Sequence, residues 1–143
     1  MAAASDTALA AAPWWRAVDY ATVPETDAGP HRCAGTHTRL ADGRRLCWAP
    51  PVDGEWRVAV DAEVADQVVP PALARRLAGV ADPWGAWTRA EVCSKLFDVP
   101  ILVWVTTQPW PSEGSVHYGG MRAVVATLRR DGMVVSVGAR RAG

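Results

Sequence analysis

Residues 121–140, MRAVVATLRRDGMVVSVGAR, decide the fold, because two β-rich runs flank the pair Asp131-Gly132. An Asp-Gly pair supplies the positive φ angles that a tight two-residue hairpin turn requires. The runs on either side have the length of strands and are rich in β-branched residues. The stretch therefore predicts an antiparallel hairpin.

Two further Asp-Gly pairs predict hairpins earlier in the chain. Asp42-Gly43 lies within THTRLADGRRLCWA, and Asp53-Gly54 lies within WAPPVDGEWRVAVDAEV. In both segments the pattern indicates strand, turn and strand. The β-branched run ILVWVTT predicts another buried strand over residues 101–107, and residues 108–120 are expected to form a long polar loop.

Two helices are expected between the second and third hairpins. PPALARRLAGV, residues 70–80, begins with prolines suited to a first helical turn and reaches Gly79. DPWGAWTRAEVCSKLF, residues 82–97, offers Asp82 as the N-cap and ends before Pro100. The expected fold is α+β, an antiparallel sheet with two short helices packed on it.

Length and composition indicate one domain. We expect it to span residues 33–143 of the 143-residue chain, after an irregular or partly disordered arm over residues 1–32. The formal net charge is zero, so no general attraction to nucleic acid or to an anionic membrane is expected. The longest apolar stretch, residues 99–105, is far shorter than the roughly 20 residues of a membrane span.

The cysteines predict a reducing compartment. There are three, Cys33, Cys47 and Cys93, with no C-x-x-C pair, which argues against a disulfide framework or a zinc site. Cys93 is expected to be a small buried thiol. The N-terminal residues resemble a signal peptide poorly, since they lack a basic region and include Asp6. These features predict a cytoplasmic protein.

Two carboxylates end an apolar strand. In RVAVDAEV, residues 57–64, Asp61 and Glu63 are two positions apart and share one face. Like charges placed side by side repel each other, and both are costly to desolvate. A divalent cation would remove that cost, and Mg²⁺ prefers oxygen ligands together with substrate phosphates.

A second set of polar residues lies on the longer helix. Trp87, Glu91 and Lys95, the only lysine in the chain, are spaced i, i+4 and i+8 and share one face. One interpretation is a packed tryptophan beside an ordinary surface ion pair. The other is a site in which Glu91 adds a third carboxylate and Lys95 meets a phosphate.

These segments resemble a known family. VAVDAE, residues 58–63, followed by WTRAEVCSK, residues 87–95, resembles the signature of the 4′-phosphopantetheinyl transferases, a hydrophobic-Gly-x-Asp-x-Glu strand and then W-x-x-K-E-x-x-x-K. CAGTHTRLADGRRLCWA, residues 33–49, is similar to the Ser-His strand that precedes the metal strand in the two-module members. The resemblance covers residues 33–105 and implies a single phosphopantetheinyl-transferase-like module.

The resemblance assigns roles to four acidic and basic residues. Asp61, Glu63 and Glu91 would ligate Mg²⁺, and Glu91 would also help to deprotonate the acceptor serine. Lys95 would pair with phosphate and stabilise charge on the leaving group. Positioning and neutralisation of charge account for most of the catalysis in such a transfer.

The resemblance also implies substrates and partners. Thr36 and His37 occupy the place of the Ser-His pair and would bind the nucleotide phosphate of coenzyme A. The acceptor would be a serine of an acyl or peptidyl carrier protein, in secondary metabolism. Because the two-module members place the coenzyme site between modules, a single module is expected to self-associate.

Two other functions are compatible with the sequence. Ala90 stands where the family has the first lysine of its helix motif, and loops contain tryptophans such as Trp110. These features favour a related fold repurposed as a cyclase or isomerase on a small apolar biosynthetic intermediate. A non-catalytic binding partner is the third possibility, and in either case His37 could be a partly buried structural histidine.

Overall fold

The chain forms two antiparallel sheets and three helices in the part that the computed structural model describes, residues 20–23, 33, 35–50 and 52–143. The smaller sheet has the strand order β1-β3-β2 and the larger sheet the order β4-β7-β6-β5. In chain order the elements are β1 (Tyr20–Val23), β2 (Thr36–Arg39), β3 (Arg45–Trp48), β4 (Trp56–Val64), α2 (Pro71–Arg76), α3 (Pro83–Phe97), α4 (Ile101–Thr107), β5 (Gly114–Tyr118), β6 (Met121–Arg130) and β7 (Met133–Arg141).

The hairpin predicted around Asp131-Gly132 is confirmed. It joins β6 to β7, with Arg130 opposite Met133. Asp131 has φ 53° and Gly132 has φ 71°, which are the positive angles of the tight turn. These two strands form the centre of the larger sheet.

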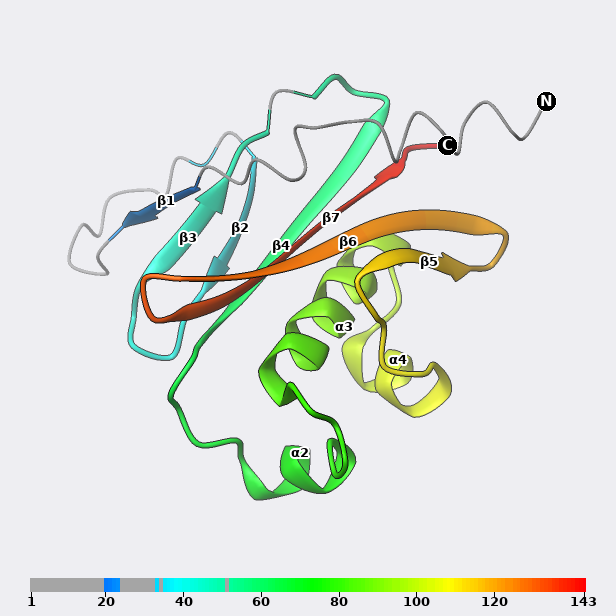
Figure 1. The fold of residues 1–143 in the computed structure, drawn as a ribbon. Helices are drawn as coiled ribbons and strands as arrows, with labels where there is room; N and C mark the ends of the chain where they lie inside the picture. Colours follow the sequence, from blue (N-terminus) through cyan, green and yellow to red (C-terminus); the bar gives the residue numbers. More distant parts are fainter. Residues whose placement is uncertain (1–19, 24–32, 34, 51) are drawn as a thin grey trace.

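The larger sheet is covered on both faces (Figure 1). Helix α3 packs on one face, where Val92 and Leu96 meet Val125. The smaller sheet packs on the other, where Leu46 and Trp48 meet strands β4 and β7. Because β7 is central and covered on both sides, its residues 133–140 are all buried.

The smaller sheet confirms one predicted hairpin and contradicts the other. Asp42-Gly43 joins β2 to β3, with Gly43 at φ 89°. The Asp53-Gly54 segment does turn, since the Glu55 N–H donates to Asp53 Oδ1, but β3 and β4 belong to different sheets. The prediction of a hairpin here is wrong, because the proline-containing segment after β3 interrupts strand pairing and carries the chain across to the larger sheet.

Both predicted helices are present. The Asp82 side chain caps α3 by accepting a hydrogen bond from the Gly85 N–H at 3.2 Å. The helix ends at Phe97, and Asp98 follows in the left-handed conformation. Helix α2 is shorter, and Gly79 turns the chain after it with φ 80°.

Residues 101–107 form helix α4, so the predicted strand is wrong. Trp104 N–H donates to the Pro100 carbonyl, and Gln108 N–H donates to the Trp104 carbonyl. Within this short run Trp104 is buried, whereas Leu102 is 69% exposed, which is a helical pattern of burial. The expected loop over 108–120 is also interrupted, because it contains β5.

The α+β class with antiparallel sheets is therefore confirmed, with a second sheet and a third helix beyond the expectation. Within the expected N-terminal arm, residues 20–23 form β1 and pair with β3. Residues 1–19 and 24–32 of that arm, including Trp14 and Trp15, lie outside the described residues. No helix in the described part of the chain is long and apolar enough to cross a membrane.

Candidate functional site

Asp61 is a buried carboxyl group at the junction of β4, β2 and α3. Its side chain is only 9% exposed. Asp61 Oδ1 accepts a hydrogen bond from Thr38 Oγ1 at 3.1 Å and lies 3.4 Å from Lys95 Nζ. Asp61 Oδ2 is buried and has no hydrogen-bond partner among the residues that the structure describes. One oxygen of this carboxyl is thus held on both sides, and the other is unsatisfied.

The electrostatic environment disfavours ionisation of Asp61. Burial raises the pKa of this carboxyl to about 7, while the ammonium group of Lys95 opposes the rise. The neighbouring Glu91 and Glu63 raise the pKa further, and the hydrogen bond from Thr38 lowers it. At neutral pH both forms of Asp61 are therefore populated.

Glu63 lies on the same face of β4, two residues beyond Asp61, as the strand pattern predicts. Its Oε2 accepts a hydrogen bond from Gln67 Nε2 at 2.6 Å, and the Trp87 side chain donates to it as well. Burial raises the pKa of Glu63, and the two hydrogen bonds oppose this effect. Trp87 thereby connects α3 to the carboxylate end of β4.

The helical face of Trp87, Glu91 and Lys95 is half-buried and packs towards β4. Lys95 Nζ donates to the Val60 carbonyl at 2.8 Å and forms its ion pair with Asp61. Burial raises the pKa of Glu91, Lys95 lowers it, and Glu63 raises it further. Lys95 thus ties the helix to the strand, in contrast to a lysine in a surface pair.

The donor set around Asp61 suits a hard cation, because all three acidic groups offer carboxylate oxygens. The unsatisfied Asp61 Oδ2 and the mutual repulsion of the carboxyl groups are features that a cation would stabilise. As the side chains stand, no three His, Cys, Asp or Glu side chains of the described chain converge into a group that could hold a metal ion. Coordination by all three carboxylates therefore requires side-chain rearrangement.

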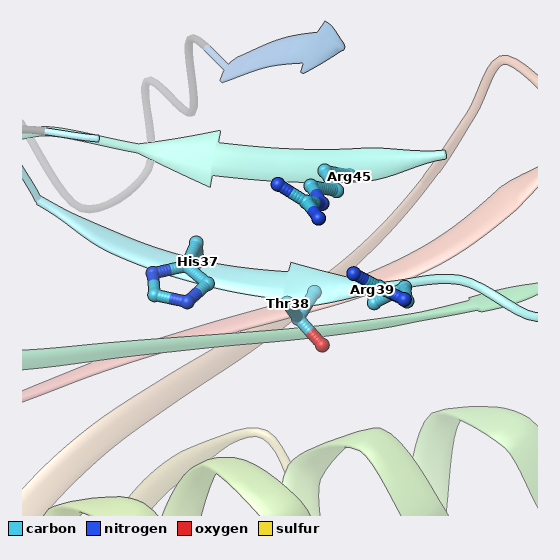
Figure 2. A pocket seen from close by; sticks show the side chains of 4 residues that line it. All are labelled: His37, Thr38, Arg39 and Arg45. Carbon is cyan, nitrogen blue, oxygen red and sulfur yellow. The ribbon is translucent and has the colours of Figure 1, made fainter. Parts of the chain in front are cut away.

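A basic pocket of about 430 Å³ adjoins this carboxyl cluster. Figure 2 shows its lining side chains, with His37, Thr38 and Arg39 on β2 and Arg45 on β3. Arg39 and Arg45 are directly opposite each other in the strand register. Thr38 belongs to both features, since it lines the pocket and also donates to Asp61.

Only one member of the predicted coenzyme-binding pair lines the basic pocket. His37 is exposed and lines the basic pocket, whereas Thr36 is absent from the lining. The prediction missed Thr38, Arg39 and Arg45, the other lining residues. A period-two pattern along THTR places the side chains of His37 and Arg39 on one face of the strand and those of Thr36 and Thr38 on the other. The pairing of Arg45 with Arg39 follows only from the register of the hairpin.

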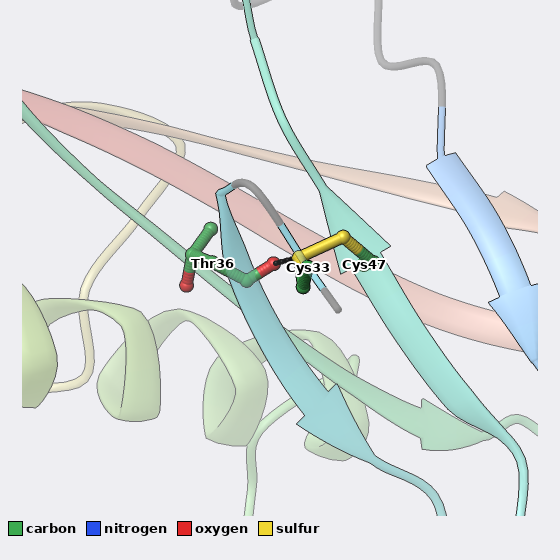
Figure 3. Close-up of a disulfide and its surroundings, with 3 residues drawn as sticks. All are labelled: Cys33, Thr36 and Cys47. Carbon is green, nitrogen blue, oxygen red and sulfur yellow. Dashed lines mark hydrogen bonds between the residues drawn. A yellow bond between two sulfur atoms is a disulfide. The ribbon is translucent and has the colours of Figure 1, made fainter. Parts of the chain in front are cut away.

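A disulfide joins Cys33 to Cys47 beside this pocket, so the expectation of no disulfide is wrong (Figure 3). Cys47 is the register partner of His37, and the bridge ties Cys33, which precedes the start of β2 at Thr36 by three positions, to β3. An odd number of cysteines does not exclude a disulfide, because two can pair and one can remain free. The free one is Cys93, which is buried as predicted. Burial raises the pKa of the Cys93 thiol to about 12, which disfavours the reactive thiolate.

Ala90, at the position of the first lysine in the resemblance, is fully buried against the larger sheet. A lysine at position 90 would have to leave the core to reach a ligand. Lys95 is therefore the lysine that can take part in the site.

Comparisons with known proteins add no match to this picture. No family model, no curated protein and no solved structure matches the chain.

Proposed function

We propose that the chain transfers the 4′-phosphopantetheine group from coenzyme A to a serine of an acyl or peptidyl carrier protein, in a reaction that depends on Mg²⁺. One observation carries the proposal: Asp61 is buried beside Glu63, Glu91 and Lys95, and one of its oxygens is unsatisfied. Burial disfavours the charged form of each carboxyl, so the cluster is unfavourable when all three groups are ionised without a cation. A cation and a phosphate ligand would supply the missing partners.

Each side chain has a distinct role in the proposed transfer. Asp61, Glu63 and Glu91 would hold Mg²⁺, which when bound neutralises charge on the pyrophosphate of coenzyme A. Glu91 would accept the proton of the attacking serine hydroxyl. The serine oxygen forms the new bond to the phosphorus that carries pantetheine, and the bond from that phosphorus to the 3′,5′-ADP oxygen breaks. Lys95, next to Asp61, would stabilise the negative charge that the 3′,5′-ADP leaving group gains.

The basic pocket supports the same substrate. Arg39 and Arg45 face each other across the hairpin, and both line the pocket together with His37. Phosphate groups of the nucleotide would suit this lining, because arginine binds phosphate oxygens well. Thr38 lines the pocket and its hydroxyl donates to Asp61, so β2 separates the two features by the thickness of one strand, and a long ligand that passes the strand edge could contact both.

The direct test is a transfer assay with coenzyme A, Mg²⁺ and several apo carrier proteins, read by intact mass. The wild-type protein should add phosphopantetheine to the carrier serine, and chelation of Mg²⁺ should abolish the addition. Asp61→Asn and Glu91→Gln should lose transfer, whereas Asp66→Asn, an exposed carboxyl just after β4, should retain it. Folded wild-type protein that modifies none of the carriers would contradict the proposal, as would transfer that persists in both site variants.

A further inference from the structure

A second pocket, of about 380 Å³, lies between α4, the segment after it, and β5. Strands β5 and β4 are at opposite edges of the larger sheet, so this pocket is separate from the Asp61 cluster. Its volume is within the range of about 300–1,000 Å³ that small-molecule sites occupy.

One side of the pocket is aromatic and rigid. Trp104 and Trp110 line it together with Pro109 and Pro111. The Trp104 ring stacks on Phe97, with 5.6 Å between centroids and 3° between the planes. Trp110 is fixed by a hydrogen bond from its Nε1 to the Arg76 carbonyl at 3.3 Å. Flat apolar walls of this kind favour a planar ligand.

The Trp104 ring carries an unused hydrogen-bond donor. Trp104 is only 1% exposed, and its Nε1 has no partner within the described residues. A buried indole N–H normally finds an acceptor, and leaving it unpaired is unfavourable. Since Trp104 lines the pocket, an acceptor atom of a ligand would satisfy this donor after a local rearrangement that uncovers the buried Nε1.

The strand side of the pocket adds further donors. Arg122 donates to Ser115 Oγ from Nε at 3.1 Å and from Nη2 at 2.7 Å. Because Ser115 Oγ accepts these bonds, its own hydroxyl hydrogen is available as a donor. His117 lies opposite Arg122 in the register and also lines the pocket. The polar side therefore favours an anionic acceptor.

We propose that this pocket binds a small aromatic carboxylate, with its planar ring against Trp110 and the neighbouring prolines and its carboxylate accepting hydrogen bonds from Trp104 Nε1 and the Ser115 hydroxyl. The proposal does not depend on the transferase activity, because no residue of the Asp61 cluster takes part. It identifies a second binding site at the β5 edge of the sheet.

The test is a titration of the ¹⁵N-labelled full chain with 2-naphthoate, followed by NMR. The indole N–H signal of Trp104, assigned by its loss in Trp104→Phe, should shift downfield with saturable 1:1 behaviour. 2-(Aminomethyl)naphthalene has the same ring and no acceptor, so it should not produce this shift. Failure of 2-naphthoate to saturate at millimolar concentration, or an equal response to the amine, would overturn the proposal.

Variants separate the pocket from general hydrophobic binding. Trp104→Phe keeps an aromatic ring, and the exposed Ser115→Ala leaves the core intact; each should weaken 2-naphthoate binding roughly three- to tenfold, the effect of one hydrogen bond. Trp84→Phe is the matched control, because Trp84 Nε1 donates to the Gln67 carbonyl away from the pocket. The site would be refuted if Ser115→Ala and a folded Trp104→Phe both bound 2-naphthoate as tightly as the wild type. It would also be refuted if Trp84→Phe weakened 2-naphthoate binding by the same factor.

Discussion

Thr38 Oγ1 donates a hydrogen bond to Asp61 Oδ1 over 3.1 Å, and this bond links the smaller sheet to the edge strand of the larger one. The basic pocket and the carboxyl cluster therefore share a residue. The position of β2 affects both the electrostatics of Asp61 and the lining of the pocket.

Removing this hydroxyl should shift the titration of Asp61. The hydrogen bond from Thr38 lowers the pKa of Asp61, so Thr38→Val should move that pKa above its wild-type value of about 7. Carboxyl ¹³C NMR can follow the titration directly. Thr36→Val is the control, since Thr36 is on the same face of β2, two residues before the threonine that donates to Asp61. An unchanged Asp61 titration in Thr38→Val would refute this coupling.

The raised pKa of Asp61 predicts how stability depends on pH. The folded protein holds this proton more tightly than the unfolded chain, in which the pKa is near 3.8. The resulting stabilisation is fully present below pH 3.8 and is lost as the pH rises to about 7, an effect on the order of 4 kcal/mol. Urea unfolding between pH 4 and pH 8 should therefore show falling stability.

Asp61→Asn should flatten that pH profile and make the protein more stable than wild type at pH 8, because the asparagine carries no charge to bury. Glu63 and Glu91 contribute in the same direction, so some slope should persist. The exposed Asp66→Asn should reproduce the wild-type profile. A wild-type stability that rises from pH 5 to pH 8 would show that Asp61 is not the buried, proton-retaining group described.

Sequence patterns predict the parts of this fold that local chemistry determines. Asp131-Gly132 supplies the turn angles, and Asp82 with Pro83 begins α3, so both elements follow from neighbouring residues. The run over residues 101–107 is ambiguous, because a short apolar segment satisfies strand and helix patterns alike. Packing of Trp104 against Phe97 and Tyr118 favours the helix, and that contact is not visible in the run itself.

In the candidate site, too, local sequence patterns predict some features and tertiary packing determines the others. Spacing alone places Asp61 with Glu63 on a strand face and Glu91 with Lys95 on a helix face. The role of Thr38 depends on how the two sheets pack, which no local pattern specifies. The disulfide likewise depends on the β2–β3 register, which brings Cys47 near Cys33 in the segment before β2.

Lys95 should have a structural role as well as a chemical one. Its ammonium group donates a partly buried hydrogen bond to the Val60 carbonyl at 2.8 Å. Lys95→Met leaves that carbonyl without this donor and should lower the free energy of unfolding by about 1–3 kcal/mol. The same variant should raise the pKa of Asp61, because the lysine charge lowers it. Lys95→Arg keeps the charge and should restore a lower Asp61 pKa. Equal Asp61 titrations in the methionine and arginine variants would contradict the ion pair.

Reduction of the disulfide should loosen the smaller sheet. The bridge spans 14 positions in sequence, and closing a loop of that size stabilises a protein by about 3 kcal/mol. Cys33→Ser with Cys47→Ser should lower stability by about that amount and increase hydrogen exchange in β2 and β3. Cys93→Ala tests a thiol outside the bridge and should leave exchange in β2 unchanged. Equal stability with and without the bridge would contradict this account.

Close packing of α3 on β7 positions Glu91 and Lys95. A Cβ added at Gly138 would lie 2.7 Å from Val92 Cγ1 and 2.9 Å from Leu96 Cδ1, so Gly138→Ala should destabilise the protein by about 1–3 kcal/mol. Gly54→Ala is the matched control, since nothing lies within 4 Å of its added Cβ. Thermal unfolding of both variants measures the difference, and equal melting temperatures would show that the helix does not approach the strand this closely.

Calorimetry with coenzyme A measures whether the Asp61 cluster binds a phosphate ligand through Mg²⁺. We expect coenzyme A to bind with Mg²⁺ present and to show no measurable binding with the metal chelated. The metal-dependent binding should be lost in Asp61→Asn but not in Asp66→Asn. Absence of coenzyme A binding at any Mg²⁺ concentration, or binding that is the same with and without the metal, would contradict this expectation.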